Sequence, residues 1–417
     1  MWEYFLFLFV LFILLNPNLF SDSSDKNYKE ISIDQAIHMA IEKSPLLVLP
    51  SIKIDRAKLG LKDIQSQNIP QVQLSLRHFI DVFNSKRQRT VPSVDFDYDF
   101  LSFIKNVYQR KYYKKLLDIS LTNKNHRQSI LISTIYQEFV KYTFLRESFN
   151  TLKEQEETLN TYQRILEIQK KHDLVPLSSV LDNQVLVKNV NKALYTTKNS
   201  LNNLSERFSY IIGSEEKVYP EKIKMDFSHF SASYIGDLAE EMSKKKVQAA
   251  EMLVKGAKMP NLPSLQINTY SVFPVNKELS FDKSFWISLS LSYMIIDAGE
   301  RKRRIASSLA NLKEAEYEHE KFKMEKQEKI KKLEEDIENL RRELNIIDTE
   351  INSIEYKIDE TKLEENDSIF SENIYFLKGR LYNKKLEQLR NNLALFLAQL
   401  DLMGKKYSFI MSSKRNM

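Results

Sequence analysis

The histidine, cysteine and glycine residues of this chain lack the spacing that enzymatic or metal-binding chemistry requires. None of the six histidines forms a His-x-x-x-His pair, the pattern that places two imidazoles on one helix face beside a metal ion. The absence of cysteine excludes disulfides, thiolate metal sites and cysteine nucleophiles. No glycine-rich phosphate loop occurs among the 7 glycines. We therefore predict no catalytic residue, no cofactor and no metal site, and we expect that the protein is not an enzyme.

Charged side chains are the remaining groups with possible chemistry. The carboxylates of Asp95, Asp97 and Asp99 alternate with the rings of Phe96 and Tyr98, so an extended strand would separate them onto opposite faces. A second set of acids lies near two predicted helix turns: Asp182, Glu364, Glu365, Asp367 and Glu372. Basic runs follow two predicted strands: Arg110-Lys111, Lys114-Lys115 and Arg301-Lys302-Arg303-Arg304. Because 62 basic and 56 acidic residues leave a net charge of only +6, we predict no nucleic-acid partner.

The N-terminus has the pattern of a secretory signal. Residues 4–15 form an apolar core that Asn16-Pro17-Asn18 interrupts, although Glu3 stands where a basic residue is usual. This core is too short to span a membrane as a helix. We predict a cleaved signal peptide over residues 1–21, and the alternative is an uncleaved N-terminal anchor.

The rest of the chain repeats one plan twice. Pro70-Gln71-Val72-Gln73-Leu74 matches Pro263-Ser264-Leu265-Gln266-Ile267 in its pattern of proline, apolar residues and glutamine. We predict a first structural repeat over residues 22–212, a linker or equatorial segment over 213–231, a second repeat over 232–405 and a C-terminal tail over 406–417.

Each repeat contains a predicted pair of strands, because apolar and polar residues alternate there with a period of two. The strands are expected at about 71–83 and 93–102 in the first repeat, and at about 264–273 and 284–296 in the second. In the last strand, Ile287, Leu289 and Leu291 alternate with serines. A tilted strand of about 9 to 11 residues is long enough to cross a membrane.

Two very long helices are predicted at about 103–173 and 300–363, because neither segment contains proline or glycine. From Leu333 to Ile358, apolar residues recur at alternating steps of four and three, which is typical of a coiled-coil seam. Such a narrow stripe needs a partner helix, and helices at 177–212 and about 369–403 would supply partners. The predicted fold class is mainly α with β, built from very long coiled-coil helices and four strands.

In this order and spacing, several short motifs resemble the TolC-like outer-membrane efflux family. The resemblance covers about residues 31–405. The motifs are an opening at Ile31-Ser32-Ile33-Asp34-Gln35-Ala36 through Lys43-Ser44-Pro45-Leu46, helix-to-strand junctions at Ile69-Pro70-Gln71-Val72 and Leu262-Pro263-Ser264-Leu265, a last strand at Trp286-Ile287-Ser288-Leu289-Ser290-Leu291, a helix entry at Ile296-Asp297-Ala298-Gly299-Glu300-Arg301, and a closing Leu402-Met403-Gly404. This chain departs from the family at the two helix turns, where Asp173 and Glu365 stand near the usual glycine positions.

The resemblance implies a homotrimer in the outer membrane. Three protomers, each contributing four strands, would form one 12-stranded β-barrel, which a periplasmic α-helical barrel continues. It further implies a passive exit duct of a tripartite efflux or type I secretion system, with a periplasmic adaptor and an inner-membrane pump of RND or ABC type as partners.

The same resemblance assigns roles to the residues singled out above. Lumen-facing positions would be Asp95, Asp97 and Asp99. Positions facing outer-membrane lipid would be Phe96, Tyr98, Ile287, Leu289 and Leu291. Candidates for a gate at the periplasmic tip are Asp182, Glu364, Glu365, Asp367 and Glu372.

Two other classes of protein share some of these features. A periplasmic adaptor is also secreted and carries a coiled-coil hairpin, but it would place one hairpin between other modules, whereas this chain predicts two. A soluble coiled-coil scaffold would leave the amphipathic strands and the signal peptide without a purpose.

Overall fold

The computed structural model describes residues 29–80, 88–99, 101–223, 233–260, 262–272, 284–294, 297–364 and 372–410. The predicted signal peptide and most of the predicted tail lie outside these ranges, as do two of the gate candidates, Glu365 and Asp367.

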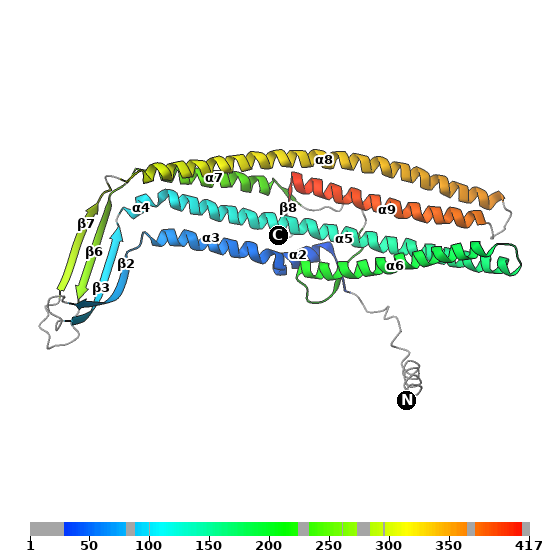
Figure 1. The fold of residues 1–417 in the computed structure, drawn as a ribbon, viewed down its shortest axis with the longest axis horizontal. Helices are drawn as coiled ribbons and strands as arrows, with labels where there is room; N and C mark the ends of the chain where they lie inside the picture. Colours follow the sequence, from blue (N-terminus) through cyan, green and yellow to red (C-terminus); the bar gives the residue numbers. More distant parts are fainter. Residues whose placement is uncertain are drawn as a thin grey trace, which may run out of the picture.

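The molecule is elongated, with a sheet at one end and helices running away from it (Figure 1). Four strands form this sheet in the order β2-β3-β6-β7, and every neighbouring pair is antiparallel. Their bounds are β2 (Gln71–Ile80), β3 (Gln88–Asp99), β6 (Ser264–Val272) and β7 (Ser284–Ser292). The predicted pairs thus join into one sheet through contact between β3 and β6, although these strands belong to different repeats.

Two helices run almost the whole length of the helical part. Each of α5 (Val107–Lys171) and α8 (Glu300–Glu364) has 65 residues, which corresponds to about 97 Å. On the half nearer the sheet, α3 (Val48–Ser66) and α7 (Leu238–Lys258) pack against them. On the half farther from the sheet, α6 (Leu177–Ile212) packs against α5, and α9 (Glu372–Lys406) packs between α5 and α8 (Figure 1). The helices therefore form one curved layer that is four helices wide at both levels.

Local sequence signals explain several boundaries of these helices. Helix α2 (Ile33–Lys43) begins with a capping box, in which the side chains of Ser32 and Gln35 bond each other's backbone N–H. Pro45 starts a short 3-10 helix, η2 (Pro45–Leu47), which separates α2 from α3. Helix α6 ends at Gly213, whose φ is 71° and whose added Cβ would lie 2.4 Å from the Lys43 carbonyl oxygen, so only glycine fits there.

The observed bounds differ from the sequence expectations by a few residues. The first long helix was expected at about 103–173, but a break at Asn106 separates a short helix, α4 (Ser102–Lys105), from α5. The strand expected at 93–102 extends further back, to Gln88, and the one expected at 284–296 ends at Ser292. The last returning helix was expected at about 369–403 and is placed at Glu372–Lys406.

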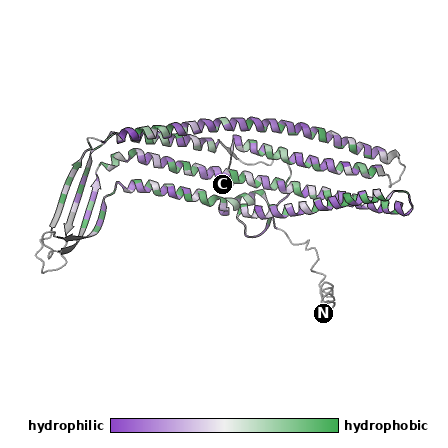
Figure 2. Cartoon of the chain, viewed as in Figure 1, coloured by the Kyte–Doolittle hydropathy of each residue, from purple (hydrophilic) through white to green (hydrophobic). Residues whose placement is uncertain are grey.

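The main hydrophobic core lies at the middle of the molecule, where α2, α5, α6 and α9 meet. Its centre is an edge-to-face pair of fully buried rings, Phe139 and Phe208, with centroids 5.5 Å apart. A smaller cluster of Leu152, Leu159 and Val190 joins α5 to α6 further from the sheet. Along the rest of their length the helices bury narrow stripes, so polar and apolar residues alternate along them (Figure 2).

Two small sheets surround this core and form an equatorial belt. Strand β1 (Lys29–Ile31) pairs in parallel with β4 (Val218–Pro220), and β5 (Ser233–Ile235) pairs antiparallel with β8 (Ser408–Ile410). The predicted linker over residues 213–231 and the first residues of the predicted tail therefore each contribute a strand to the belt.

Candidate functional site

The register of the four-stranded sheet gathers apolar residues on one face. Tyr98 stands opposite Ile267, which in turn stands opposite Leu289. A parallel row contains Val72 opposite Phe96. Residues directly opposite each other in antiparallel strands point to the same side. The first row therefore crosses β3, β6 and β7, and the second crosses all four strands through Thr269 to Ile287.

The other face of the sheet is polar. Asp97 stands opposite Gln71 on one side and Asn268 on the other. The neighbouring row runs from Asp99 through Gln266 to Ser290. The hydroxyl of Ser75 donates a hydrogen bond to Asp95 Oδ2 at 2.9 Å, which ties β2 to β3 on this face.

The apolar face is uncovered in the single chain. Five of its side chains have exposed fractions between 65% and 77%: Val72, Leu74, Ile287, Leu289 and Leu291. Water-soluble proteins rarely expose so continuous an apolar surface. In the described part of the chain, the two outer strands β2 and β7 each pair with one strand only, so the sheet also has two open edges.

At the opposite end of the molecule, the α5–α6 turn lies near the ends of α8 and α9 (Figure 1). Asp173 has φ 53°, in the left-handed region where glycine is usual. The Leu174 N–H donates to the Gln169 carbonyl at 2.9 Å, and Lys170 pairs with the Asp173 carboxylate at 3.1 Å. Aspartate is one of the few side chains that tolerate this conformation. The turn therefore keeps the geometry that the missing glycine would have given.

Three of the five predicted gate acids belong to the described residues, and these three lie at this same end. Asp182 is exposed on α6, near the turn. Glu364 is the last residue of α8 and Glu372 is the first residue of α9, while Glu365 and Asp367 lie outside the described residues.

A cavity of about 970 Å³ lies between α9 and the α5–α6 hairpin, and Asp182 lines it. The opposite wall, on α9, contains Tyr375, Phe376 and Arg380. The rings of Tyr162 and Tyr375 stack across it with centroids 4.7 Å apart, and the Thr158 and Tyr382 hydroxyls are 3.1 Å apart. These α9 residues are not identifiable from the sequence, because nothing in their spacing indicates which helix they face.

Ion pairs fix the helix layer near the equator. The ammonium of Lys326 on α8 lies 2.5 Å from Asp237 and 3.1 Å from Glu240, both at the start of α7. Burial opposes the charge of Lys326, but hydrogen bonds to the two carboxylates outweigh burial and raise its pKa. Asp237 also caps α7 by accepting hydrogen bonds from the Ala239 and Glu240 N–H groups.

A buried acid, Glu138 on α5, forms an ion pair that joins α5 to α6. Glu138 is 1% exposed, and its carboxylate lies 3.3 Å from both Lys141 and Arg207. A carboxylate in such a position needs these partners, because an unpaired buried charge would be strongly destabilising.

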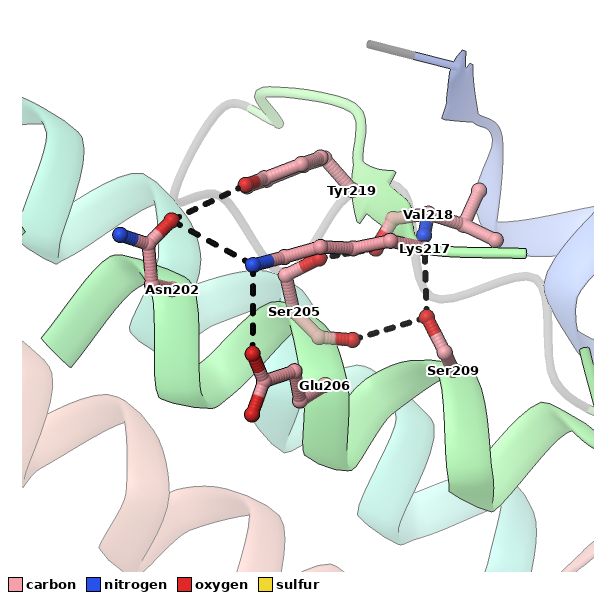
Figure 3. Close-up of polar contacts among 7 residues, drawn as sticks. All are labelled: Asn202, Ser205, Glu206, Ser209, Lys217, Val218 and Tyr219. Atoms are coloured by element: carbon pink, nitrogen blue, oxygen red, sulfur yellow. Dashed lines mark hydrogen bonds and ion pairs between the residues drawn. The ribbon is translucent and has the colours of Figure 1, made fainter. Parts of the chain in front are cut away.

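Hydroxyl groups of α6 hold the belt strand β4 in place (Figure 3). The Ser205 hydroxyl donates to the Val218 carbonyl at 2.7 Å, and the Val218 N–H donates to the Ser209 hydroxyl at 2.9 Å. Both serines are buried, so these bonds also satisfy polar groups that water cannot reach. The Tyr219 hydroxyl and the Lys217 ammonium reach Asn202 on the same helix (Figure 3).

Within the described ranges, no group of three or more histidine, aspartate or glutamate side chains is arranged to hold a metal ion. No helix in those ranges is both long and apolar enough to cross a membrane.

Comparison with known proteins finds relatives by structure only. No family profile and no curated protein matches the sequence. Among solved structures, CusC, described as forming a transmembrane channel, aligns with a TM-score of 0.77 at 10% identity, over 92% of this chain and 95% of its own. The outer-membrane protein VceC from Vibrio cholerae aligns with a TM-score of 0.73 at 13% identity, over 91% of this chain and 97% of its own. The outer-membrane channel CmeC from Campylobacter jejuni aligns with a TM-score of 0.75 at 14% identity, over 92% of this chain and 87% of its own.

At such low identity the likeness concerns the fold, and it extends over nearly the full length of each chain. This chain therefore has the fold of the TolC-like outer-membrane efflux channels, the family that its sequence motifs resemble.

Proposed function

We propose that this protein is the outer-membrane channel subunit of a tripartite efflux or type I secretion system. In this role it is a passive exit duct and not an enzyme, and its substrates are delivered by an inner-membrane pump of RND or ABC type through a periplasmic adaptor. The signal peptide directs the chain to the cell envelope and is then removed.

The observation that carries the proposal is the sheet with one exposed apolar face and two open edges. Apolar side chains such as Leu74 and Leu291 are suited to contact lipid, because burying them against acyl chains removes them from water. Open strand edges cannot remain in lipid, since each unpaired N–H and C=O group there costs several kcal/mol.

A homotrimer resolves the problem of the edges. Since the four strands alternate in direction, β7 of one protomer runs antiparallel to β2 of the next when the sheets are placed side by side. Three copies of four strands then close a barrel whose strands are all antiparallel, the arrangement of bacterial outer-membrane barrels. Asp95, Asp97 and Asp99 line its lumen, and Phe96, Tyr98, Ile287, Leu289 and Leu291 face lipid.

The helical layer continues the barrel into the periplasm. Its open sides, α3 and α6 at one edge and α8 at the other, become the contacts between protomers. The five acids near the hairpin ends, Asp182, Glu364, Glu365, Asp367 and Glu372, are the gate candidates.

The alternative hypothesis, a periplasmic adaptor, explains the sheet and the two hairpins less well. Each of the two helical hairpins is joined to a pair of strands, and the two pairs form one sheet. An adaptor with a single hairpin between separate modules would not need this arrangement.

The test is to extract the full chain from outer membranes and measure its mass in mild detergent by light scattering, then its conductance in planar bilayers. We expect a trimer that gives discrete channels. A monodisperse monomer, or a trimer without conductance, would contradict the proposal.

A further inference from the structure

The helix turns that adjoin the sheet carry the entire positive surplus of the chain. Segments 58–66, 107–118, 251–258 and 297–304 are the last turns of α3 and α7 and the first turns of α5 and α8, the latter with its capping residues. Together they contain twelve basic and five acidic residues, a net charge of +7, whereas the whole chain has +6. We call the twelve the basic collar: Lys58, Lys62, Arg110, Lys111, Lys114, Lys115, Lys255, Lys258, Arg301, Lys302, Arg303 and Arg304.

Most collar charges have no carboxylate partner. Lys58 pairs with Asp55 at 3.5 Å. Among the residues that the structure describes, no carboxylate lies within 4.0 Å of the other collar cations. Arg301 instead donates to the Lys258 carbonyl at 2.9 Å, and Arg303 to the Ala298 carbonyl at 3.0 Å. The collar therefore retains an uncompensated positive potential.

Aromatic and apolar side chains are interleaved with the collar. The Arg110 guanidinium lies 4.5 Å from the centre of the Phe103 ring, and the Lys111 ammonium lies 5.2 Å from that of Tyr108. Phe103 is 53% exposed, and Ile69, three residues after the end of α3, is 62% exposed. Tyrosine and other amphipathic side chains are typical of the boundary between lipid and water.

The collar also contains a cavity of about 680 Å³ between the ends of α5, α7 and α8. Arg301 and Arg304 line it, and the Nε atom of Arg301 is buried without a hydrogen-bond partner in the described part of the chain. Two acids share the wall, Asp297 and Glu300, but Asp297 is engaged in capping α8 through the Gly299 and Arg301 N–H groups.

The rest of the cavity wall is suited to the apolar part of a lipid. It contains the side chains of Met252, Leu253, Met259, Leu262 and Met294 and the rings of Tyr108, Tyr112 and Tyr113. Met294 is 58% exposed and follows β7, whose exposed Leu289 and Leu291 lead along the sheet toward it.

We propose that the basic collar and this cavity bind anionic phospholipid from the membrane leaflet that borders the helices. The phosphate lies against the collar cations and is a suitable acceptor for the Arg301 Nε–H, while the acyl chains lie on the apolar face of the sheet. The proposal rests on the membrane placement of the sheet given under Proposed function. Basic residues at a membrane surface attract anionic lipid.

The test is native mass spectrometry of the full-length protein in detergent, titrated with phosphatidylglycerol or with phosphatidylcholine of the same acyl chains. We expect tighter binding of phosphatidylglycerol, weakened by salt. The test variant is Lys111→Gln/Lys114→Gln/Lys302→Gln/Arg304→Gln, which changes exposed residues only. It should bind phosphatidylglycerol at least about 10-fold more weakly, because four surface charges are removed.

Two further variants control this result. Lys329→Gln/Lys332→Gln/Arg341→Gln/Lys357→Gln removes the same charge from exposed positions of α8 far from the sheet, and it should bind as the wild type does. Lys111→Arg/Lys114→Arg/Lys302→Arg/Arg304→Lys keeps the charge and should also retain binding.

Three outcomes would overturn the proposal: equal affinity of the wild type for both lipids, equal losses in the collar and control variants, or displacement of the lipid by inorganic phosphate alone. The last outcome would indicate a site for free phosphate. These readouts do not depend on conductance, so failure of lipid binding in a conducting trimer would leave the proposed function intact.

Discussion

Position 139 is occupied by a phenylalanine that is fully buried against Phe208, at the point where four helices meet. Phe139→Ala should lower the free energy of unfolding by about 3 to 5 kcal/mol, because it removes a large apolar side chain and leaves a cavity. Thermal unfolding followed by circular dichroism measures the change. Tyr356→Ala, at a side chain 70% exposed on α8, is the control and should change the melting temperature little. Similar losses in both variants would mean that the centre of the core lies elsewhere.

His126 should make stability depend on pH. Burial lowers its pKa, the neighbouring charges of Arg127 and Lys405 lower it further, and Asp237 opposes them. The unfolded chain therefore takes up this proton at a higher pH, about 6.5, than the folded chain does. Between the two pKa values the unfolded state binds more protons, so stability falls as the pH drops below about 6.5.

The corresponding experiment compares melting temperatures at pH values of about 7.5 and 5.5, on either side of the unfolded histidine pKa. His126→Gln should show a smaller decrease on acidification than the wild type. His38→Gln, at an exposed side chain 3.7 Å from Glu42, is the control and should decrease as the wild type does. An unchanged decrease in the His126 variant would show that other groups set the acid sensitivity.

At the scale of elements, the register of the sheet predicts that substitutions on its apolar and polar faces differ in their effect on assembly. Phe96→Arg or Leu289→Arg puts a charge on the apolar face, and near the middle of a membrane this costs up to about 2 to 4 kcal/mol. Asp97→Ala and Ser290→Ala alter the polar face and should assemble normally. The amount of trimer recovered from outer membranes distinguishes the two sets. If both sets assembled equally well, the apolar face would not contact lipid.

The long helix α8 shows which element properties can be predicted from spacing. Of the eight expected seam residues, Leu333 and Leu340 are half-buried. The other six are buried: Ile337, Leu344, Ile347, Ile351, Ile354 and Ile358. Their alternating steps of four and three require a partner helix, and the nearest candidate along the chain, α9, packs along α8. Exact strand ends are harder to predict, since residues at the ends of strands gain little from pairing and burial.

For the whole molecule, threefold symmetry would bring the acids at the hairpin ends close together around the tunnel axis. Glu364→Gln/Glu365→Gln/Asp367→Asn should reduce cation selectivity and change single-channel conductance in planar bilayers, because a ring of carboxylates attracts cations. Glu154→Gln/Glu156→Gln/Glu157→Gln, on α5 but 14 to 17 residues before its end at Lys171, removes the same charge and should have much less effect. Unchanged selectivity in an assembled tip variant would remove these acids from the gate.

The sequence by itself determined the types and the order of the elements. Period-two alternation, long segments without proline or glycine, and proline at the junctions are local properties, and they act within a few residues of the chain. For this reason α6 was predicted at the residues where it is found, 177–212, and Asp297-Ala298-Gly299 was recognised as the entry to α8. The motif order was also sufficient to indicate the fold family.

The tertiary structure alone decided which distant segments meet. Pairing of β3 with β6 depends on closing a loop of more than 160 residues, for which no local pattern exists. The same holds for Lys326 with Asp237, for Glu138 with Arg207, and for the cavities at the two ends of the helical layer. A long polar side chain on an amphipathic helix can face water or a partner equally well, and only the packing of the neighbouring helix decides between them.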